Sequence, residues 1–452
     1  MSATVEEVQE KLVASPELLP SGTEAFNAYY EQYSSGYWIP DSGSGWTRVN
    51  ETGLARYLRI EHGVSRQRDE TGSSAMERTL LEIQRNFHIG YAGKLAGYKA
   101  GLIEQNGEKI LVTASPNYIE PVDGQFPKID QFLKGLLGDQ RIHFDCWMKL
   151  AMEAHRSGMI RPGQALVLAG PRDCGKSVLQ NQIITPLLGG RMAKPYLYMS
   201  GQTSFNSNLF EAEHLMIEDD IASTDIRARR TFGTYIKQYT ANEEVQHHAK
   251  NKAAMTLRPF WRLSISCNEE PENLSILPPM DDSLFDKMII LKAERKPMPM
   301  PTETYGERVA FQEKIKSELP SYLNYLLKLA VPSELRASRY GILAYQNPDI
   351  IKAMNDIAPE CRLLELIDQH FDQGRKPWVG QAIALETELL NQDSNVREQT
   401  RSLLRYFNSC GAYLSRLAEK RPDRVRSSTV NGLKKYTILF PNKSWAAPGG
   451  AN

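Results

Sequence analysis

The sequence is short of cysteine, of long apolar runs and of net charge. Its five cysteines are scattered over 452 residues without the spacing of a metal site, so we expect reduced thiols and a cytoplasmic protein. No N-terminal apolar segment and no apolar run of about 18 residues is present, which predicts neither secretion nor membrane insertion. Lys+Arg and Asp+Glu both total 54, so only the distribution of charge can point to a partner.

Residues 1–140 show no pattern of catalytic side chains. They contain no carboxylate pair or His/Cys cluster that would support a polymerase, primase or nuclease, so we expect none of these activities there. Local patterns predict helices over 25–33, 52–61 and 74–87, and a hairpin with strands at 36–40 and 45–49.

The strongest motif present is the stretch 170–177, GPRDCGKS, which fits G-x-x-x-x-G-K-[ST]. An apolar run of strand length precedes it at 164–169, and 178–184 can continue as a helix up to Pro186. In that context the loop N–H groups cradle phosphates, Lys176 reaches the β- and γ-phosphates of ATP, and the Ser177 hydroxyl binds Mg²⁺. The bland alternative is a glycine turn with an exposed lysine. The predicted nucleotide-binding residues are Gly170, Pro171, Arg172, Asp173, Cys174, Gly175, Lys176, Ser177 and Val178.

Two further strand ends carry polar residues that suit phosphoryl transfer. The apolar segment 215–217 is followed by Glu218 and Asp219, which we expect to hold Mg²⁺ together with Ser177 and to orient the attacking water. The two acids could exchange these roles. The strand predicted at 261–267 ends in Asn268, a candidate sensor of the γ-phosphate, or else an ordinary strand-end cap. Such strand ends meet at the carboxyl edge of an open sheet.

A basic segment lies between these acids and Asn268. No acidic residue occurs from 245 to 268, and 245–249 and 253–257 read as two strands around a turn with Lys250 and Lys252. His248 belongs to the same segment, and we expect it to contact DNA together with Lys250 and Lys252. A lysine-tipped hairpin suits contact with nucleic-acid phosphates. A solvated loop is the alternative.

Together, the loop, the acidic strand end, the lysine hairpin and Asn268 resemble the ATPase core of superfamily 3 helicases, notably those of phage and plasmid replication and of poxvirus-type primase-helicases. The likeness covers about 140–295 and implies an AAA+-like fold, a hexameric ring and ATP-driven movement on single-stranded DNA. It assigns Lys176, Glu218, Asp219 and Asn268 to catalysis and the hairpin to the DNA-binding pore.

One position departs from that family. Lys287 occurs where the family usually has an arginine that reaches the neighbouring subunit's γ-phosphate. A lysine supplies charge but not the bidentate fork of a guanidinium. Arg227, Arg229 or Arg230 are therefore alternative carriers of this catalytic role, if they are not simply a solvated basic face.

The C-terminal region has its own basic character. Residues 401–440 hold nine Lys/Arg and two acidic residues, the pattern of a phosphate-binding surface. Three predicted helices, at 361–372, 378–390 and 397–420, precede a hairpin at 424–440, which resembles a winged helix. We expect Arg405, Arg424 and Arg426 to contact DNA. Winged helices also dock proteins.

We therefore predict an α/β protein with an AAA+-like P-loop core, an N-terminal α+β accessory domain and a C-terminal winged-helix-like domain. The predicted function is an ATP- and Mg²⁺-dependent DNA helicase that assembles into a homo-oligomeric ring on single-stranded or forked DNA, with a separate primase or polymerase as a possible partner. The alternative is an ATP-switched ring or scaffold in phage defence or DNA packaging, without unwinding. Predicted segments are a flexible 1–22, an accessory domain 23–140, the ATPase core 141–300, a helical connector 301–355 interrupted at Pro320 and Pro332, a winged-helix-like domain 356–442, and a tail 443–452.

Overall fold

The computed structural model describes residues 26–43, 45–158, 161–218, 226–242, 244–248, 254–274, 276–278, 280, 282–356, 358–371, 376–430 and 432–440. The chain divides into two compact units, Met1–Ile350 and Ile351–Asn452, which are described separately below. Within the described ranges, no helix is both long enough and apolar enough to cross a bilayer.

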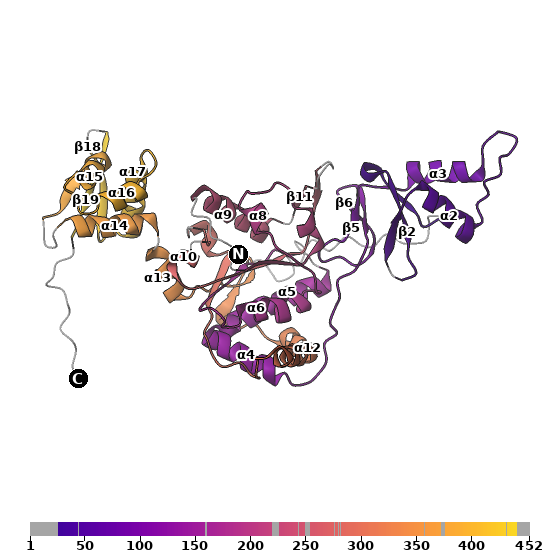
Figure 1. The fold of residues 1–452 in the computed structure, drawn as a ribbon, viewed down its shortest axis with the longest axis horizontal. Coiled ribbons are helices and arrows are strands. Elements are labelled where there is room, and N and C mark those ends of the chain that lie inside the picture. The colour runs from indigo at the N-terminus through magenta and orange to yellow at the C-terminus, as the bar shows by residue number, and fades with distance from the viewer. Residues whose placement is uncertain are drawn as a thin grey trace, which may run out of the picture. The chain divides into compact units, whose positions relative to one another are not determined.

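The first unit begins with a small α+β region. Its four-stranded sheet has the order β3-β2-β1-β4, and α2 (Glu51–His62) and α3 (Ala75–Asn86) accompany it, in indigo and violet in Figure 1. The strands are β1 (Tyr29–Glu31), β2 (Gly36–Pro40), β3 (Trp46–Val49) and β4 (His88–Ile89). The predicted hairpin is confirmed as β2 and β3, and the predicted helices over 52–61 and 74–87 are confirmed as α2 and α3.

The helix predicted over 25–33 is wrong. Tyr29–Glu31 is a strand that pairs with both β2 and β4, and Gln32–Ser34 forms a 3₁₀ turn. Tyr29 and Glu31 are both buried, which is the alternation of a strand, and the Glu31 carboxylate accepts hydrogen bonds from Ser34 Oγ and Trp38 Nε1. These sheet contacts outweigh a weak local helix preference.

A second small sheet connects this region to the larger α/β part. It has the order β5-β7-β6, from β5 (Tyr91–Gly93), β6 (Gly101–Gln105) and β7 (Glu108–Val112). The fully buried Glu213 carboxylate accepts from the Gly97 backbone N–H at 2.8 Å and forms an ion pair with Arg191. This buried, paired carboxylate therefore links the segment between β5 and β6 to the start of β10 in the larger α/β part.

The centre of the first unit is a five-stranded sheet in which every pair is parallel. Its order is β14-β8-β13-β10-β9, with β8 (Ala165–Ala169), β9 (Met192–Ala193), β10 (His214–Glu218), β13 (Arg262–Cys267) and β14 (Met288–Lys292). β8 and β13 are buried at every position, as expected for parallel strands covered on both faces. The predicted α/β class is confirmed. All carboxyl ends lie at one edge, termed the carboxyl edge here.

Helices cover both faces of this sheet (Figure 1). α4 (Pro127–Leu137), α5 (Arg141–Ser157) and α12 (Tyr305–Lys328) lie on one side, and α8 (Tyr196–Met199) and α9 (Ile226–Ala241) on the other. The first group packs around fully buried side chains such as Phe144, Leu168 and Tyr322. The remaining short elements of the unit are the 3₁₀ helix η2 (Gly138–Gln140), α6 (Lys176–Val178), the π-helical η3 (Leu179–Ile184), α7 (Thr185–Leu187), η4 (Ser207–Glu211), β11 (Val245–His247), β12 (Met255–Leu257), α10 (Pro271–Leu274), α11 (Asp282–Phe285), η5 (Ser333–Leu335), β15 (Arg336–Ala337) and β16 (Gly341–Ile342). α13 (Pro348–Asp356) follows at the division between the units.

α12 continues through Pro320, where the sequence predicted an interruption. An interior proline costs a helix about 3 kcal/mol. The buried side chains of Leu319, Tyr322 and Leu323 around it offset that cost, because burying each large apolar side chain contributes about 1.5–3 kcal/mol.

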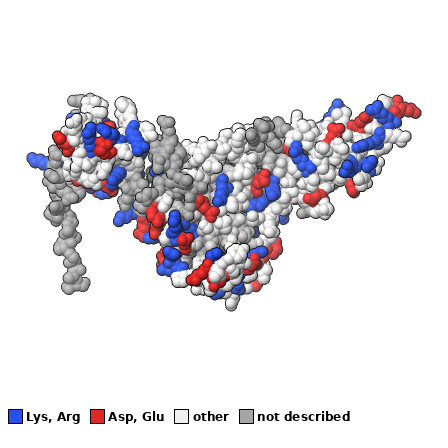
Figure 2. Space-filling view, in the orientation of Figure 1, with Lys and Arg blue, Asp and Glu red and all other residues white. Residues whose placement is uncertain are grey.

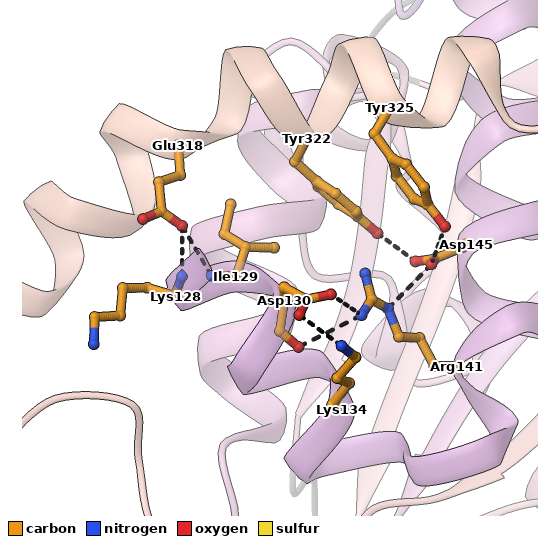
Figure 3. Close-up of polar contacts among 9 residues, drawn as sticks. All are labelled: Lys128, Ile129, Asp130, Lys134, Arg141, Asp145, Glu318, Tyr322 and Tyr325. Atoms are coloured by element: carbon orange, nitrogen blue, oxygen red, sulfur yellow. Dashed lines mark hydrogen bonds and ion pairs between the residues drawn. The ribbon is translucent and has the colours of Figure 1, made fainter. Parts of the chain in front are cut away.

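Polar contacts fasten α12 to α4 and α5 (Figure 3). The Glu318 carboxylate accepts from the backbone N–H groups of Lys128 and Ile129 at the start of α4. The Tyr322 hydroxyl donates to Asp145 at 2.6 Å, and Arg141 Nε donates to the same carboxylate at 3.1 Å. This network sets the position of α12, whose first turns border the site described below.

The described residues of the second unit pack around a small hydrophobic core. It contains α14 (Pro359–His370), α15 (Ala382–Leu389), α16 (Arg397–Leu403) and α17 (Ser409–Lys420), with a sheet in the order β17-β19-β18. The strands are β17 (Trp378–Gly380), β18 (Val425–Val430) and β19 (Leu433–Ile438). The predicted C-terminal hairpin is confirmed. The helix predicted over 378–390 begins with a strand instead, and that over 397–420 is interrupted after Leu403.

Candidate functional site

The glycine-rich loop leaves the carboxyl end of β8 and enters α6. A Cβ atom on Gly170 would lie 2.2 Å from the Ala293 carbonyl oxygen, so only glycine lets the two backbones pass this closely. Gly175 has φ of 108°, a backbone conformation that other residues rarely adopt. Steric constraints therefore require glycine at both fixed glycine positions of the motif. A simple glycine turn would not require both.

Lys176 lies inside this loop. It is 5% exposed, and its Nζ donates to Gly170 O at 2.9 Å, Pro171 O at 2.8 Å and Asn268 Oδ1 at 3.1 Å. No carboxylate pairs with it within the described part of the chain. These partners, and Cys174 Sγ at 3.9 Å, are neutral groups, so a buried ammonium here favours the binding of an anion. The alternative interpretation, a glycine turn with an exposed lysine, is therefore wrong about the exposure of Lys176.

Strand register brings the other predicted residues to the same edge. Glu218 ends β10 opposite Ser266 of β13, and Cys267 of β13 lies opposite Ala169 of β8. Asn268, 7% exposed, follows Cys267 directly. The second predicted acid, Asp219, lies outside the described residues.

Asn181 links the loop to the acid, and sequence reasoning missed it. Its Nδ2 donates to Ser177 O at 3.0 Å and to Glu218 Oε1 at 3.1 Å, and Lys194 Nζ lies 3.4 Å from the other oxygen of Glu218. The only signal in the sequence is that Asn181 lies four residues after Ser177, one helical turn further on.

A cavity of about 310 Å³ opens over the loop. Residues 172–178 and Asn268 line it from below. Its other wall contains Arg308, Phe311 and Gln312 of α12 with Met298 and Thr302 before it, none of which the sequence indicated. The α12 capping box of Thr304 and Glu307 predicts where that helix starts, but nothing in the sequence predicts that it packs beside a loop some 130 residues away.

Two titratable groups near the loop have perturbed pKa values. Burial raises the pKa of the Cys174 thiol, so that side chain stays protonated and unreactive. Hydrogen bonds from its own backbone N–H and from Asn273, together with the nearby cations Lys176 and Arg172, lower the pKa of Glu270. Glu270 is thus a further carboxylate beside the loop that sequence reasoning missed.

Lys287 lies at the opposite edge of the sheet from the loop of its own chain. It directly precedes β14, and its carbonyl accepts from Ala165 N at the start of β8. It is 8% exposed, and Nζ lies 2.7 Å from Asp286 Oδ1, while Arg339 pairs with the other Asp286 oxygen at 2.8 Å. Any action of Lys287 on a γ-phosphate therefore requires a second subunit.

The alternative arginines follow the acidic strand as predicted. All three lie in α9, and Arg229 donates to Leu277 O at 2.8 Å. The side chains of Arg227 and Arg230 lie outside the described part of the structure.

The two strands of the basic segment pair as predicted. β11 and β12 are antiparallel, with His247 opposite Met255. His248 is exposed, and its backbone N–H donates to Asn206 Oδ1 at 2.6 Å. Lys250 and Lys252, at the predicted tip, lie outside the described residues.

The C-terminal arginines differ in availability. Arg424 is only 15% exposed and pairs with Asp368 at 2.6 Å, which places its charge inside the fold. Arg405 and Arg426 are exposed, and their hydrogen-bond partners among the described residues are nearby backbone and hydroxyl oxygens.

On the face shown in Figure 2, cationic and anionic side chains are interspersed over the described residues, in keeping with the balanced total charge.

Comparison with known proteins gives a partial family match and a fold likeness. A family of unknown function (DUF5906) matches residues 168–283, which contain the glycine-rich loop, Glu218 and Asn268. No curated protein matches the chain. Among solved structures, "The A form apo structure of NrS-1 C terminal region-CTR" has a TM-score of 0.53 at 12% identity, covering 92% of this chain and 96% of that one.

"The apo structure of NrS-1 C terminal region (305-718)" has a TM-score of 0.52, with the same identity and coverage. A structure of JCV helicase with a bound small molecule has a TM-score of 0.27 over 44% of this chain, too low to bear on the fold. At 12% identity, the likeness to the NrS-1 region is one of fold, and it extends over nearly the full length of both chains.

Proposed function

We propose that this protein is an ATP- and Mg²⁺-dependent DNA helicase of a phage, satellite or plasmid replication system, which translocates on single-stranded DNA as a hexameric ring. The observation that carries the proposal is the convergence of three neighbouring parallel strands, β8, β13 and β10, at one edge. They bring Lys176, Asn268 and Glu218 together around the glycine-rich loop.

The residues present fit a nucleotide with its metal. The buried, unpaired ammonium of Lys176 and the loop N–H groups bind the phosphates, and the cavity above the loop receives the rest of the nucleotide. Ser177 and Glu218, assisted by Asp219, would hold Mg²⁺, which would supply positive charge next to the phosphates. Asn268 orients the γ-phosphate or the attacking water.

DNA contact is assigned to two basic elements. Lys250 and Lys252, which lie in the sequence between β11 and β12, are assigned to DNA contact in the ring, and the second unit is assigned to DNA binding as a winged helix. Its helices followed by a hairpin, and the exposed Arg405 and Arg426, support that assignment. The hairpin is what favours a motor over an ATP-switched scaffold.

Unwinding of a forked DNA by the full chain tests the proposal. The Lys250→Ala, Lys252→Ala double variant should keep its basal ATPase but lose DNA stimulation and unwinding, because the hairpin is separate from the hydrolysis chemistry. The Lys316→Ala, Lys352→Ala variant removes two exposed lysines, one from α12 and one from α13, and is the matched control. If the wild type hydrolyses ATP but never separates strands, the scaffold function is correct instead.

A further inference from the structure

A second and larger cavity lies at the other edge of the central sheet. Its volume is about 900 Å³, and it is lined at the amino ends of two strands by Arg262, the first residue of β13, and by Gln164, which precedes β8. Arg161, Trp147 and Tyr340 also line it. We call it the amino-edge cavity. The glycine-rich loop follows the opposite ends of these strands, so the two cavities are distinct sites.

Arg262 is a buried cation without a counter-ion in the part of the chain that the structure describes. It is 3% exposed, and its Nη1 donates to Arg161 O at 2.9 Å and Trp261 O at 2.8 Å. Its guanidinium carbon lies 4.6 Å from the centre of the Phe260 ring. Burial, and then the nearby charge of Arg161, lower the pKa of Arg262 to about 9. Isolated charges in such a place are costly unless an opposite charge arrives.

A count of charges around the cavity defines what is missing. Arg156 pairs with Glu120 at 3.2 Å, and Arg339 pairs with Asp286 at 2.8 Å. The one acidic side chain of the lining, Glu153, is already paired with a lysine of its own helix. Two guanidinium groups, of Arg161 and Arg262, therefore have no carboxylate partner among the described residues.

A phosphate monoester has the charge and shape that match this deficit. It carries about −1.5 to −2 at neutral pH and offers several acceptor oxygens. Guanidinium groups bind such oxygens with paired, charge-assisted hydrogen bonds. A carboxylate would neutralise only one of the two arginines. The cavity volume falls in the range of small-ligand sites, about 300–1,000 Å³, and Trp147, Leu150 and Tyr340 supply apolar surface for the remainder of a ligand.

We propose that the amino-edge cavity is a second binding site, for a phosphate monoester of about nucleotide size, in which Arg262 and Arg161 bind the phosphate. The site goes beyond the proposed ATPase, which uses the other edge of the sheet. Two sources share this chemistry, a free mononucleotide and the 5′-phosphate end of a nucleic-acid strand.

Calorimetric titration of the full-length chain with AMP tests this site. The Lys176→Ala variant disables the glycine-rich loop and should still bind one AMP per chain, with inorganic phosphate as a competitor. Adding Arg161→Gln or Arg262→Gln should weaken AMP about tenfold or more, the loss expected for a charged hydrogen bond. Arg336→Gln changes an exposed arginine that does not line the cavity, and should leave the AMP affinity unchanged.

The controls separate binding from folding and one source from the other. Thermal melting identifies variants that fail to fold, and Arg161 is exposed, so its variant keeps the test open if Arg262→Gln unfolds. Competition by a short 5′-phosphorylated oligonucleotide, but not by its unphosphorylated form, assigns the site to strand ends; competition by neither assigns it to free mononucleotides. The proposal is overturned if folded Lys176→Ala protein binds no AMP, or if folded arginine variants bind it with unchanged affinity. Neither result affects the ATPase proposal, because the loop is disabled throughout.

Discussion

Replacing Lys176 by Met tests the nucleotide site most directly, because the substitution should have little effect on the stability of the free protein but a large effect on nucleotide binding. Without nucleotide, its buried Nζ loses hydrogen bonds to Gly170 O, Pro171 O and Asn268 Oδ1, but an uncompensated buried ammonium is removed as well. These effects offset each other, so we expect the thermal midpoint to move by no more than about 4 °C. When nucleotide is bound, nothing offsets the loss of the contact between the Lys176 ammonium and the phosphates.

The expected loss of nucleotide affinity follows from the charge-assisted contact that methionine cannot make. Such a hydrogen bond contributes about 1.5–3 kcal/mol, so binding should weaken by about 10- to 150-fold. At a ligand concentration of about 100 times Kd, the wild type gains about 2.7 kcal/mol of stability. A variant weakened about 100-fold gains only about 0.4 kcal/mol at that concentration. ATP turnover should fall further, because Lys176 also neutralises charge in the transition state.

Thermal melting measures the stability of the free protein and, with Mg²⁺ and a non-hydrolysable ATP analogue, the stabilisation by nucleotide. A steady-state ATPase assay measures turnover. Lys149→Met is the matched control, since Lys149 is also a buried lysine, at 8% exposure, but pairs with Glu153 on α5 outside the site. It should retain the nucleotide-induced shift and turnover. If Lys176→Met retains them as well, the loop is not the nucleotide site.

Three further predictions concern other residues. Glu218→Gln should lower ATP turnover by about 10²-fold or more while nucleotide binding persists, because metal positioning dominates phosphoryl transfer; normal turnover, measured by phosphate release, would move the metal acid elsewhere. Inactive Lys287→Ala subunits mixed with inactive Lys176→Ala subunits should regain ATPase, because some interfaces then combine an intact loop with an intact lysine; no recovery after confirmed subunit exchange would remove Lys287 from this role. Tyr322→Phe should destabilise the fold by about 1–3 kcal/mol in a denaturant titration, because the buried Asp145 carboxylate loses its 2.6 Å donor; an unchanged midpoint would show that Arg141 and Tyr325 satisfy that carboxylate without it.

Local chemistry was sufficient to predict the core of the site. The spacing of Gly170, Gly175 and Lys176 after a short apolar run predicts a loop between a buried strand and a helix, and the structure has both. Strand-end positions likewise predicted that Glu218 and Asn268 meet the loop, since parallel strands bring their carboxyl ends to one edge. These are periodic, short-range patterns, which a single sequence displays directly.

Contacts between distant segments could not be read in this way. The helix expected over 25–33 became the strand β1 because residues near 38 and 88 pair with it, and Pro320 is accommodated because α12 packs on α4 and α5. The same packing brings Arg308 to the cavity over the loop. Within the second unit, a separate long-range contact pairs Arg424 with Asp368. Propensity and motif spacing act over a few residues, whereas burial and ion pairing depend on which surfaces meet after folding. For that reason the sequence predicted which residues gather at the carboxyl edge of the sheet, while the amino-edge cavity became visible only in the folded chain.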